Sequence, residues 1–416
     1  MTRADSVTVS VKPPRAALRG VFLLGPAFVA AIAYVDPGNV AANLSGGARY
    51  GYLLVWVLVA ANLIAALVQY QSAKLGLVSG RTVPELLGER LKPAPRRLFW
   101  VQAELVAAAT DLAEVIGGAI ALRLLFGLPL LVGGAIVGAV SMGLLLVQSR
   151  YGQRPFEGVI IGLLTIIAVG FLAGLFVTPP NGLDVLGGLV PRFEGTDSVL
   201  IAASMLGATV MPHAIYVHSA LARDRHGKAV GDSSRRRLLR ATKWDVGIAL
   251  ALAGVVNIGM LLLAAVNLRG VSDTDTIDGA YRAIGNSLGP AVALIFAIGL
   301  LASGLASTSV GSYAGGTIMA GLLKRRIPIY VRRLVTLIPA LIILGIGVDP
   351  TQALVVSQVF LSFGIPFVLV PLLRLTNDRS VMGDYVNSRL IKVILTAIVV
   401  VIAVLNVVLI VLTVTG

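Results

Sequence analysis

The chain has 416 residues, of which 57% are hydrophobic and only 13% are charged, and its formal net charge is +14. Charged residues make up about a quarter of an ordinary soluble domain, so this composition, with a mean hydropathy of +0.90, excludes a soluble globular fold. Cysteine is absent, which excludes disulfides and thiolate metal sites and leaves oxygen, imidazole and thioether groups as metal ligands.

Apolar runs of membrane-spanning length recur along the chain, separated by short polar connections. About 20 helical residues cross the hydrocarbon core, and continuously apolar runs exclude the alternating pattern of a transmembrane β-barrel. We therefore expect an all-α polytopic membrane protein of about eleven helices, forming one transporter domain over residues 1–416. The first span is expected to be uncleaved, because no separate short signal peptide precedes it. The predicted spans are residues 20–45, 52–78, 98–124, 128–148, 155–177, 198–221, 244–267, 287–323, 332–349, 352–373 and 390–415.

The basic residues are distributed unevenly between the two sides of this predicted bundle. Most of the 34 Lys and Arg residues lie in the N-terminal segment and in every second connection, whereas Asp273, Asp275 and Asp278 lie in a connection of the other side. The positive-inside rule then predicts a cell-membrane protein with a cytoplasmic N-terminus and, for an odd number of spans, an extracellular or periplasmic C-terminus. Because the basic charge has this topogenic role, we expect the lipid bilayer as a partner, no nucleic acid and no obligate protein partner.

The first predicted span carries a helix-breaking polar centre in the stretch AIAYVDPGNVAANL. A carboxylate such as Asp36 is costly at the bilayer centre unless it faces a cavity or a partner. Pro37 lacks an N–H and Gly38 disfavours helix, so the backbone is expected to open and to free carbonyls such as that of Ala33. With the amide oxygen of Asn39, these groups predict a cation site of hard oxygen ligands. The alternative is a proline kink with Asp36 paired to an arginine, although no basic residue lies at comparable depth in a neighbouring span.

The third predicted span carries three acids in the stretch QAELVAAATDLAEVIGGAIAL. At 100° per residue, Glu104, Asp111 and Glu114 lie on one helical face. Such a stripe within a membrane indicates a proton relay, with interhelical pairing or cytoplasmic exposure as alternatives. Arg332 and Arg333, at the start of the ninth span, are candidate partners of these acids or ordinary positive-inside anchors.

A second break lies in the sixth predicted span, in the stretch GATVMPHAIYVHSAL. Pro212 frees the carbonyl of Ala208, and the thioether of Met211 is a soft ligand that suits Mn²⁺, Fe²⁺, Co²⁺ or Cd²⁺ better than Mg²⁺ or Ca²⁺. A lone methionine usually packs, but its place at a proline break favours metal binding. His213 and His218 titrate near neutral pH, so they are candidates for protonation or gating, with a structural hydrogen-bonding role as the alternative.

The two breaks lie five helices apart, which is typical of an inverted-repeat transporter with paired discontinuous helices. This spacing predicts a first repeat over residues 20–177, a second over 198–373 and an extra helix over 390–415. Gln358 and Asn257 are uncharged polar residues within spans, and they either line the pathway or hydrogen-bond helices together.

The motifs DPGN and MPH resemble the signature pair of the Nramp family (natural resistance-associated macrophage protein) of divalent-metal transporters. The resemblance continues through QYQSAKLGLVSGRTVPELL, TDLAEVIGGAIAL, ASGLASTSVGSYAGGTIMAG and SQVFLSFGIPF. It implies a LeuT-like fold of ten core helices in two inverted repeats, often with an eleventh, and uptake of Mn²⁺ or Fe²⁺ coupled to proton entry. One departure is Gly316, where the family usually has Gln.

The resemblance also implies roles for individual residues. The implied metal contacts are Asp36, Asn39, Met211, the carbonyls of Ala33 and Ala208 and, in some states, Gln358. The implied proton pathway comprises Asp36, His213, Asp111, Glu114 and Arg333, with Glu104, Arg332 and His218 as further members.

We therefore expect a proton-coupled importer of divalent transition metals that works by alternating access, with Mn²⁺ as the first substrate and Fe²⁺, Co²⁺ and Cd²⁺ as others. It is not expected to be an enzyme or to hold a permanent cofactor. The alternatives are a Mg²⁺ or broad-range divalent carrier and a sodium-coupled amino-acid transporter of the same fold, in which Asp36 would repel the substrate carboxylate. A membrane-bound metal sensor or scaffold is a further alternative, but the sequence has no soluble effector domain.

Overall fold

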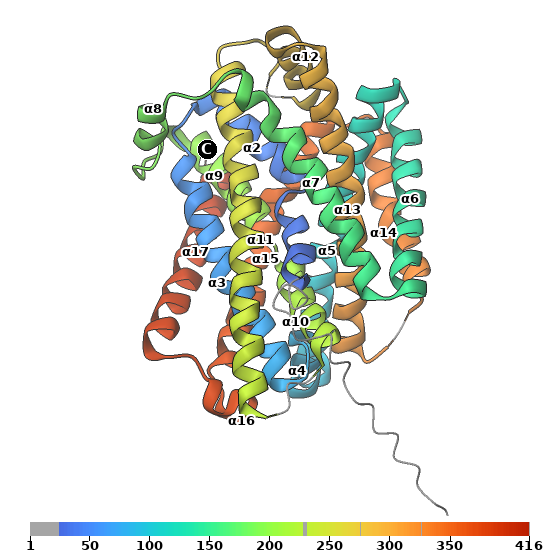
Figure 1. Ribbon diagram of the computed structural model, residues 1–416, viewed down its shortest axis with the longest axis vertical. Coiled ribbons are helices and arrows are strands. Elements are labelled where there is room, and N and C mark those ends of the chain that lie inside the picture. The colour runs from blue at the N-terminus through green and yellow to red at the C-terminus, as the bar shows by residue number, and fades with distance from the viewer. Residues whose placement is uncertain (1–24, 228–230, 275, 326, 416) are drawn as a thin grey trace, which may run out of the picture.

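The computed structural model describes residues 25–227, 231–274, 276–325 and 327–415, and no strand occurs within these ranges. The first broken helix comprises α1 (Pro26–Ala31), the 3₁₀ turn η3 (Ile32–Tyr34) and α2 (Pro37–Tyr50), and the second comprises α9 (Gly195–Thr209) and α10 (Pro212–His226). The other long helices are α3 (Val55–Ser79), α5 (Pro93–Phe126), α6 (Leu130–Tyr151), α7 (Gln153–Val177), α11 (Asp232–Asn267), α13 (Pro290–Leu323), α14 (Ile329–Gly345), α15 (Pro350–Thr376) and α17 (Arg389–Thr415). Short elements connect them: α4 (Val83–Arg90), α8 (Gly182–Gly187), α12 (Ile277–Leu288), α16 (Arg379–Met382) and the 3₁₀ turn η4 (Gly383–Tyr385) (Figure 1).

The helices match the predicted membrane spans in number and approximate position. Eight helices of the described chain are long and apolar enough to cross a membrane, with α9 and α10 counted as one. The α1–α2 pair, α6 and α14 lie at the positions of the first, fourth and ninth predicted spans. The all-α polytopic fold with two discontinuous helices is therefore confirmed. Residues 20–24 of the first predicted span and the basic N-terminal segment lie outside the described residues.

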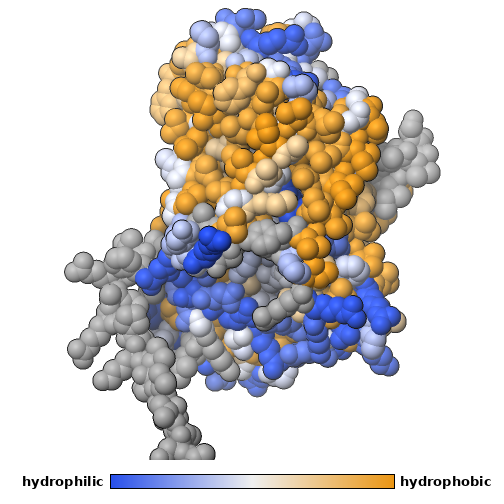
Figure 2. All heavy atoms as spheres, turned by 90° about the vertical axis from the view of Figure 1, so that its right-hand side faces the viewer, coloured by the Kyte–Doolittle hydropathy of each residue, from blue (hydrophilic) through white to orange (hydrophobic). Residues whose placement is uncertain are grey.

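The two ends of the bundle differ in charge, with a hydrophobic band between them. Figure 2 shows this band on the face that carries α6 and α14, with hydrophilic residues gathered above and below it. We call the end with α4 and α16 the basic end, because many Lys and Arg residues lie in the chain around these two helices. The opposite end, with α8 and α12, is called the acidic end. The last helix, α17, runs from the basic end to the acidic end (Figure 1).

The broken helices lie inside the bundle. Helix α2 packs against α11 and α9, and α13 packs along α5 and α7, while α6 and α14 cover α5 and α17 covers α15. The start of α1 is fixed by the carboxylate of Asp245 on α11, which accepts hydrogen bonds from the backbone N–H groups of Gly25 (3.0 Å) and Ala27 (2.9 Å). Because the first N–H groups of a helix have no partner within it, this carboxylate satisfies them and holds α1 against α11.

Candidate functional site

The first break is built by Pro37. In a continuous helix the carbonyl of Ala33 would accept from the N–H of residue 37, but proline has none. The helix stops at η3 and restarts at Asp36, whose backbone is extended and whose carboxylate caps α2 by accepting from the N–H of Asn39 (2.7 Å). Asp36 is completely buried. The chain therefore places one carboxylate and one free carbonyl at a helix break inside the bundle.

The side chain of Asn39 joins the two breaks. Its Nδ2 group donates to Oδ1 of Asp36 (2.7 Å) and to the carbonyl of Ala208 (3.1 Å). The second carboxylate oxygen of Asp36, Oδ2, has no hydrogen-bond partner. The amide hydrogens thus lie between two oxygen acceptors, one from each broken helix. Rotation of the amide would place its own oxygen, which is an acceptor, toward the same position.

The second break is built by Pro212 in the same way. The carbonyl of Ala208 would pair with the N–H of residue 212 in a continuous helix, and Pro212 lacks it. Helix α9 ends at Thr209, and α10 begins after Met211, which has extended backbone and is completely buried. Each break therefore frees one carbonyl, and the contact between Asn39 and Ala208 brings the two breaks together.

Gln358 on α15 lies directly against the first break. A Cβ atom on Gly38 would lie 1.9 Å from Nε2 of Gln358, so the missing side chain of Gly38 makes the room for this amide. Gln358 is completely buried and its Oε1 atom has no hydrogen-bond partner. A third helix thus contributes a polar group beside Asp36 and Asn39.

Within the described ranges, no three His, Asp or Glu side chains are grouped so that they could hold a metal ion. The affinity of an oxygen site for a cation rises with its number of charged ligands. The two breaks supply one carboxylate, that of Asp36, and otherwise uncharged groups.

Two acids of α5 are paired with arginines of α14. Arg332 donates to Glu104 (2.8 Å), and Arg333 forms an ion pair with Asp111 (3.0 Å) in which both side chains are almost completely buried. The sequence left open whether these arginines pair with the acids of α5 or only anchor the helix at the membrane surface, and the structure shows that they pair. Glu114 is different, because it is completely buried and neither carboxylate oxygen has a hydrogen-bond partner.

Asp111 and Glu114 converge on one point of α13. A Cβ atom on Gly311 would lie 3.0 and 3.1 Å from the two oxygens of Glu114 and 3.4 Å from Oδ1 of Asp111. The two carboxylates therefore face the same small residue, as expected for acids on one helical face.

The two histidines have different surroundings. Nδ1 of His213 lies 3.4 Å from the hydroxyl of Thr110, and its Nε2 atom has no partner. Nδ1 of His218 lies 2.7 Å from Oε1 of Gln69, and Nε2 of Gln69 donates to the hydroxyl of Tyr34 in the first break. His218 is thus connected to the break through two side chains, which the sequence did not indicate.

Two further side chains donate hydrogen bonds to carbonyls of the first break, and Asn257 takes the second of the two roles expected for it. Asn257 on α11 donates to the carbonyl of Tyr34 (2.6 Å) and accepts from Asn43 (2.8 Å), so it hydrogen-bonds helices together. Ser303 on α13 donates to the carbonyl of Val35 (2.6 Å). Ser303 lies in a stretch of small residues that indicates close packing, and no signal in that stretch marks one serine as a partner of a free carbonyl.

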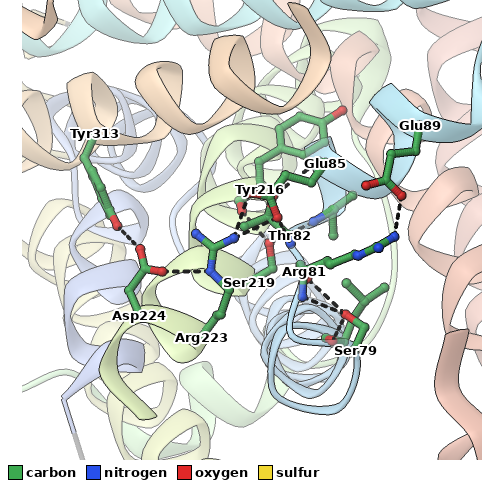
Figure 3. A network of polar contacts seen from close by, with 12 residues as sticks. Ser79, Arg81, Thr82, Glu85, Glu89, Tyr216, Ser219, Arg223, Asp224 and Tyr313 are labelled. Carbon is green, nitrogen blue, oxygen red and sulfur yellow. Dashed lines mark hydrogen bonds and ion pairs between the residues drawn. The ribbon is translucent and has the colours of Figure 1, made fainter. Parts of the chain in front are cut away.

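A polar network joins α10, α4 and α13 at the basic end (Figure 3). Arg223 on α10 donates to both carboxylate oxygens of Glu85 on α4 (2.8 and 2.7 Å) and to Asp224 (2.7 Å). Tyr313 on α13 donates to the same Asp224 (2.9 Å). The end of α10 is therefore held to two other helices.

Helix α4 is itself held by a capping box. Thr82 accepts from the N–H of Glu85 (3.2 Å), and Glu85 accepts from the N–H of Thr82 (2.8 Å). Burial alone would raise the pKa of Glu85, but the hydrogen bond from the Thr82 backbone and the contact with Arg223 outweigh it and hold this pKa below its ordinary value. The carboxylate thus stays charged and keeps its contact with Arg223.

The acidic end is open. A cavity of about 640 Å³, here called the acidic-end cavity, lies between α2, α9 and α15. Its lining includes Val355 and Val359, which lie within one helical turn of Gln358. At its edge, Asp197 accepts from Arg49 (3.0 Å) and from Tyr50 (2.9 Å). This cavity lies on the acidic-end side of the two breaks, and Asp36 and Gln358 themselves are completely buried.

Comparison with known proteins places this architecture in a family. Residues 27–412 match the family described as natural resistance-associated macrophage protein-like, Nramp. The chain is 61% identical over 395 residues to the divalent metal cation transporter MntH of Mycobacterium tuberculosis strain H37Rv, covering 95% of this chain and 92% of that protein. The structure of the Eremococcus coleocola manganese transporter, in complex with an aromatic bis-isothiourea substituted compound, matches with a TM-score of 0.85 and 32% identity, over 95% of this chain and 88% of that one.

A more distant match concerns the fold alone. Mhp1, a nucleobase-cation-symport-1 family transporter in a closed conformation, aligns with a TM-score of 0.57 and 17% identity, over 84% of this chain and 77% of that one. Because the family match covers residues 27–412 and the identity to the Mycobacterium tuberculosis transporter is 61%, the chain belongs to the Nramp family.

Proposed function

We propose that this protein imports divalent transition-metal ions, Mn²⁺ first and also Fe²⁺, Co²⁺ and Cd²⁺, together with protons by alternating access. One observation carries the proposal: a buried carboxylate and a proline-freed carbonyl from the other broken helix meet at the side chain of Asn39. The names of the relatives, a divalent metal cation transporter and a manganese transporter, support it. Only binding and movement are required, so the protein is a transporter and not an enzyme.

In this proposal the metal is held between the two breaks. Asp36 supplies the only charge, and the neutral ligands are the Asn39 amide oxygen, the Met211 thioether and the carbonyls of Ala33 and Ala208. The amide of Asn39 rotates as the cation takes the place of its hydrogens. Gln358 joins the ligands when α15 moves over the site, which its contact with Gly38 supports. The thioether selects softer ions over Mg²⁺ and Ca²⁺.

Protons take a path along α5 in this proposal. A proton that leaves Asp36 passes to Glu114 and Asp111, and Glu104 lies further along α5 toward the basic end. Arg333 and Arg332 stabilise the charged forms of Asp111 and Glu104, as their ion pairs support. His213 and His218 are proposed as further members of the path.

The proposed direction of transport follows from the charge of the two ends. The basic end is assigned to the cytoplasm by the positive-inside rule, so the acidic-end cavity opens to the outside of the cell membrane, with a cytoplasmic N-terminus and an external C-terminus. Residues 20–177 and 198–373 are proposed as the two inverted repeats that move against each other, with 390–415 as an extra helix. The five-helix spacing of the breaks supports this division.

The test follows metal entry and internal pH together in proteoliposomes. Wild-type protein is expected to bring in Mn²⁺ and to acidify the interior, and Met211→Ala is expected to let Mg²⁺ or Ca²⁺ compete better against Mn²⁺ because the soft ligand is gone. Met260→Ala is the matched control, since Met260 on α11 is also completely buried but lies at neither break.

Each part of the proposal has its own refutation. Unchanged selectivity in Met211→Ala refutes the role of the thioether. Mn²⁺ entry without acidification under any gradient refutes proton coupling and leaves metal transport intact. No metal entry at all refutes the function.

A further inference from the structure

An apolar groove runs along α15 from the basic end toward the acidic end. It consists of three cavities of about 480, 210 and 400 Å³. The first and second share Phe367, and the second and third share Phe360, so they follow one another along the same helix. Helix α5 supplies the other wall through residues such as Leu98, Val101 and Leu105. We call this feature the α5–α15 groove.

The basic end of the groove carries two arginines, Arg90 and Arg374. Arg90 forms an ion pair with Asp378 (2.6 Å) and donates to Ser380 (3.1 Å), but a guanidinium has five N–H donors and this one keeps others. Arg374 is exposed, and within the described chain no carboxylate lies at ion-pair distance from it. The remaining lining of this part of the groove is apolar.

The surroundings add positive charge. Two further exposed basic residues, Lys92 and Arg97, lie close in sequence to Arg90. A chemical group that fills the groove must therefore combine an elongated apolar part with a negative charge at the basic end.

The part of the groove nearer the basic end, formed by the first two cavities, matches one acyl chain in length. From Arg374 to Phe363 the helix rises by about 17 Å at 1.5 Å per residue. One leaflet contributes half of a hydrocarbon core of about 30 Å, or about 15 Å. A molecule whose charged group contacts the arginines would thus have its chain within the apolar part.

We propose that the α5–α15 groove is a binding site for an anionic phospholipid of the leaflet at the basic end. Its phosphate contacts Arg374 and Arg90, and one acyl chain lies between α5 and α15. Basic pockets at the edge of membrane helices are suited to such headgroups. The charge of the arginines favours this occupant over a second copy of the chain, whose facing surface would bring the same arginines together.

The experiment is native mass spectrometry of the full chain in detergent, with phosphatidylglycerol or phosphatidylcholine of identical acyl chains added. One arginine near a lipid surface is worth about a fivefold change in affinity. Arg374→Ala is therefore expected to weaken phosphatidylglycerol binding by about fivefold and phosphatidylcholine binding by less, because the choline cation offsets the charge of the phosphate. Arg379→Ala is the matched control, because this exposed arginine of α16 does not line the groove.

A second pair of variants tests the acyl-chain part. Val101→Trp places a large ring in the groove and is expected to weaken the binding of both lipids. Val140→Trp on α6 is its control, since both valines are 43% exposed and Val140 lies outside the groove. Exposed positions are chosen so that the variants fold.

The outcomes separate the alternatives. The site is supported if Arg374→Ala loses the preference for phosphatidylglycerol while Arg379→Ala keeps it, and if Val101→Trp binds both lipids more weakly while Val140→Trp does not. Equal effects of Arg374→Ala and Arg379→Ala indicate general surface charge and overturn it. Equal affinity of the wild type for the two lipids also overturns it. A dimer that persists when lipid is added would indicate a second copy of the chain in the groove and would overturn it as well.

Discussion

Gly315 on α13 is the residue that allows Arg332 to reach Glu104. A Cβ atom at this position would lie 1.8 to 2.2 Å from three atoms of the Arg332 guanidinium. The arginine side chain is only 4% exposed, so it has little other space to occupy. The neighbouring Gly316, where relatives were expected to have Gln, has no atom within 4 Å of the equivalent position. Two adjacent glycines thus have different roles, and the departure at Gly316 leaves open space.

Gly315→Ala is expected to displace Arg332 and to leave Glu104 without its partner. Breaking a buried ion pair costs about 3 kcal/mol or more, so the melting temperature in detergent should fall and proton uptake should slow. Gly316→Ala is the control and should be neutral or slightly stabilising, by less than about 1 kcal/mol, because alanine favours helix. Equal melting temperatures for the two variants would contradict the proposed contact.

At the residue scale, the sequence predicts those site residues whose neighbours break the helix. Asp36 and Met211 each precede a proline within a membrane span, so the chain itself marks them. Ser303 and Asn43 carry no such mark, because a small polar residue in a span is also typical of packing. Their partners lie far away in the sequence and are known only once the helices are placed.

At the scale of elements, the apolar runs predicted the membrane spans well and the helix ends less well. Helix α11 begins at Asp232, twelve residues before the expected residue 244, because backbone hydrogen bonds continue past the point where hydropathy falls. Helix α4 was expected as part of a connection. Its sequence TVPE carries a capping-box signature, with Glu85 three residues after Thr82, that would have predicted this helix.

The contact between α10 and α4 is expected to set the balance between the two open states. Arg223→Ala removes the bonds to Glu85 and Asp224, which should weaken closure of the basic end by about 1 kcal/mol, or about fivefold. The chain has no cysteine, so Val359→Cys in the acidic-end cavity can report this state by reaction with an impermeant thiol reagent.

Slower labelling of that cysteine is the expected result for Arg223→Ala. Arg81→Ala is the control, since the ion pair of Arg81 with Glu89 does not reach α10. An unchanged labelling rate in the Arg223 variant would show that this network does not hold the basic end closed.

The same contact predicts a pH dependence of stability. The pKa of Glu85 is lower in the folded protein than its ordinary value of 4.5, so its stabilising contribution is present above that value and is lost as pH falls through the lowered pKa. Wild type should therefore melt at a higher temperature than Glu85→Gln at about pH 7, and the difference should shrink as the pH falls below 4.5 and through the lowered pKa. A difference that stays constant over this range would argue against the charged contact.

At the scale of the whole molecule, the charge difference between the ends predicts the orientation. An impermeant thiol reagent applied to intact cells should label Leu186→Cys on α8, which is exposed at the acidic end. It should not label Ser388→Cys, which is exposed just before α17 at the basic end. The reverse pattern would place the basic end outside and overturn the proposed direction of import.

At the two proline breaks, the stability of the helix and the proposed metal site place opposite requirements on the sequence. Alanine at position 37 or 212 would restore an N–H donor, let the helix continue and improve its stability, but it would also occupy the carbonyl of Ala33 or Ala208 that the proposed site uses. Substitutions chosen only to raise thermal stability often reduce activity when they lie at functional sites. Replacing Pro37 and Pro212 by alanine is therefore expected to raise the melting temperature of the protein and to impair metal binding at the proposed site.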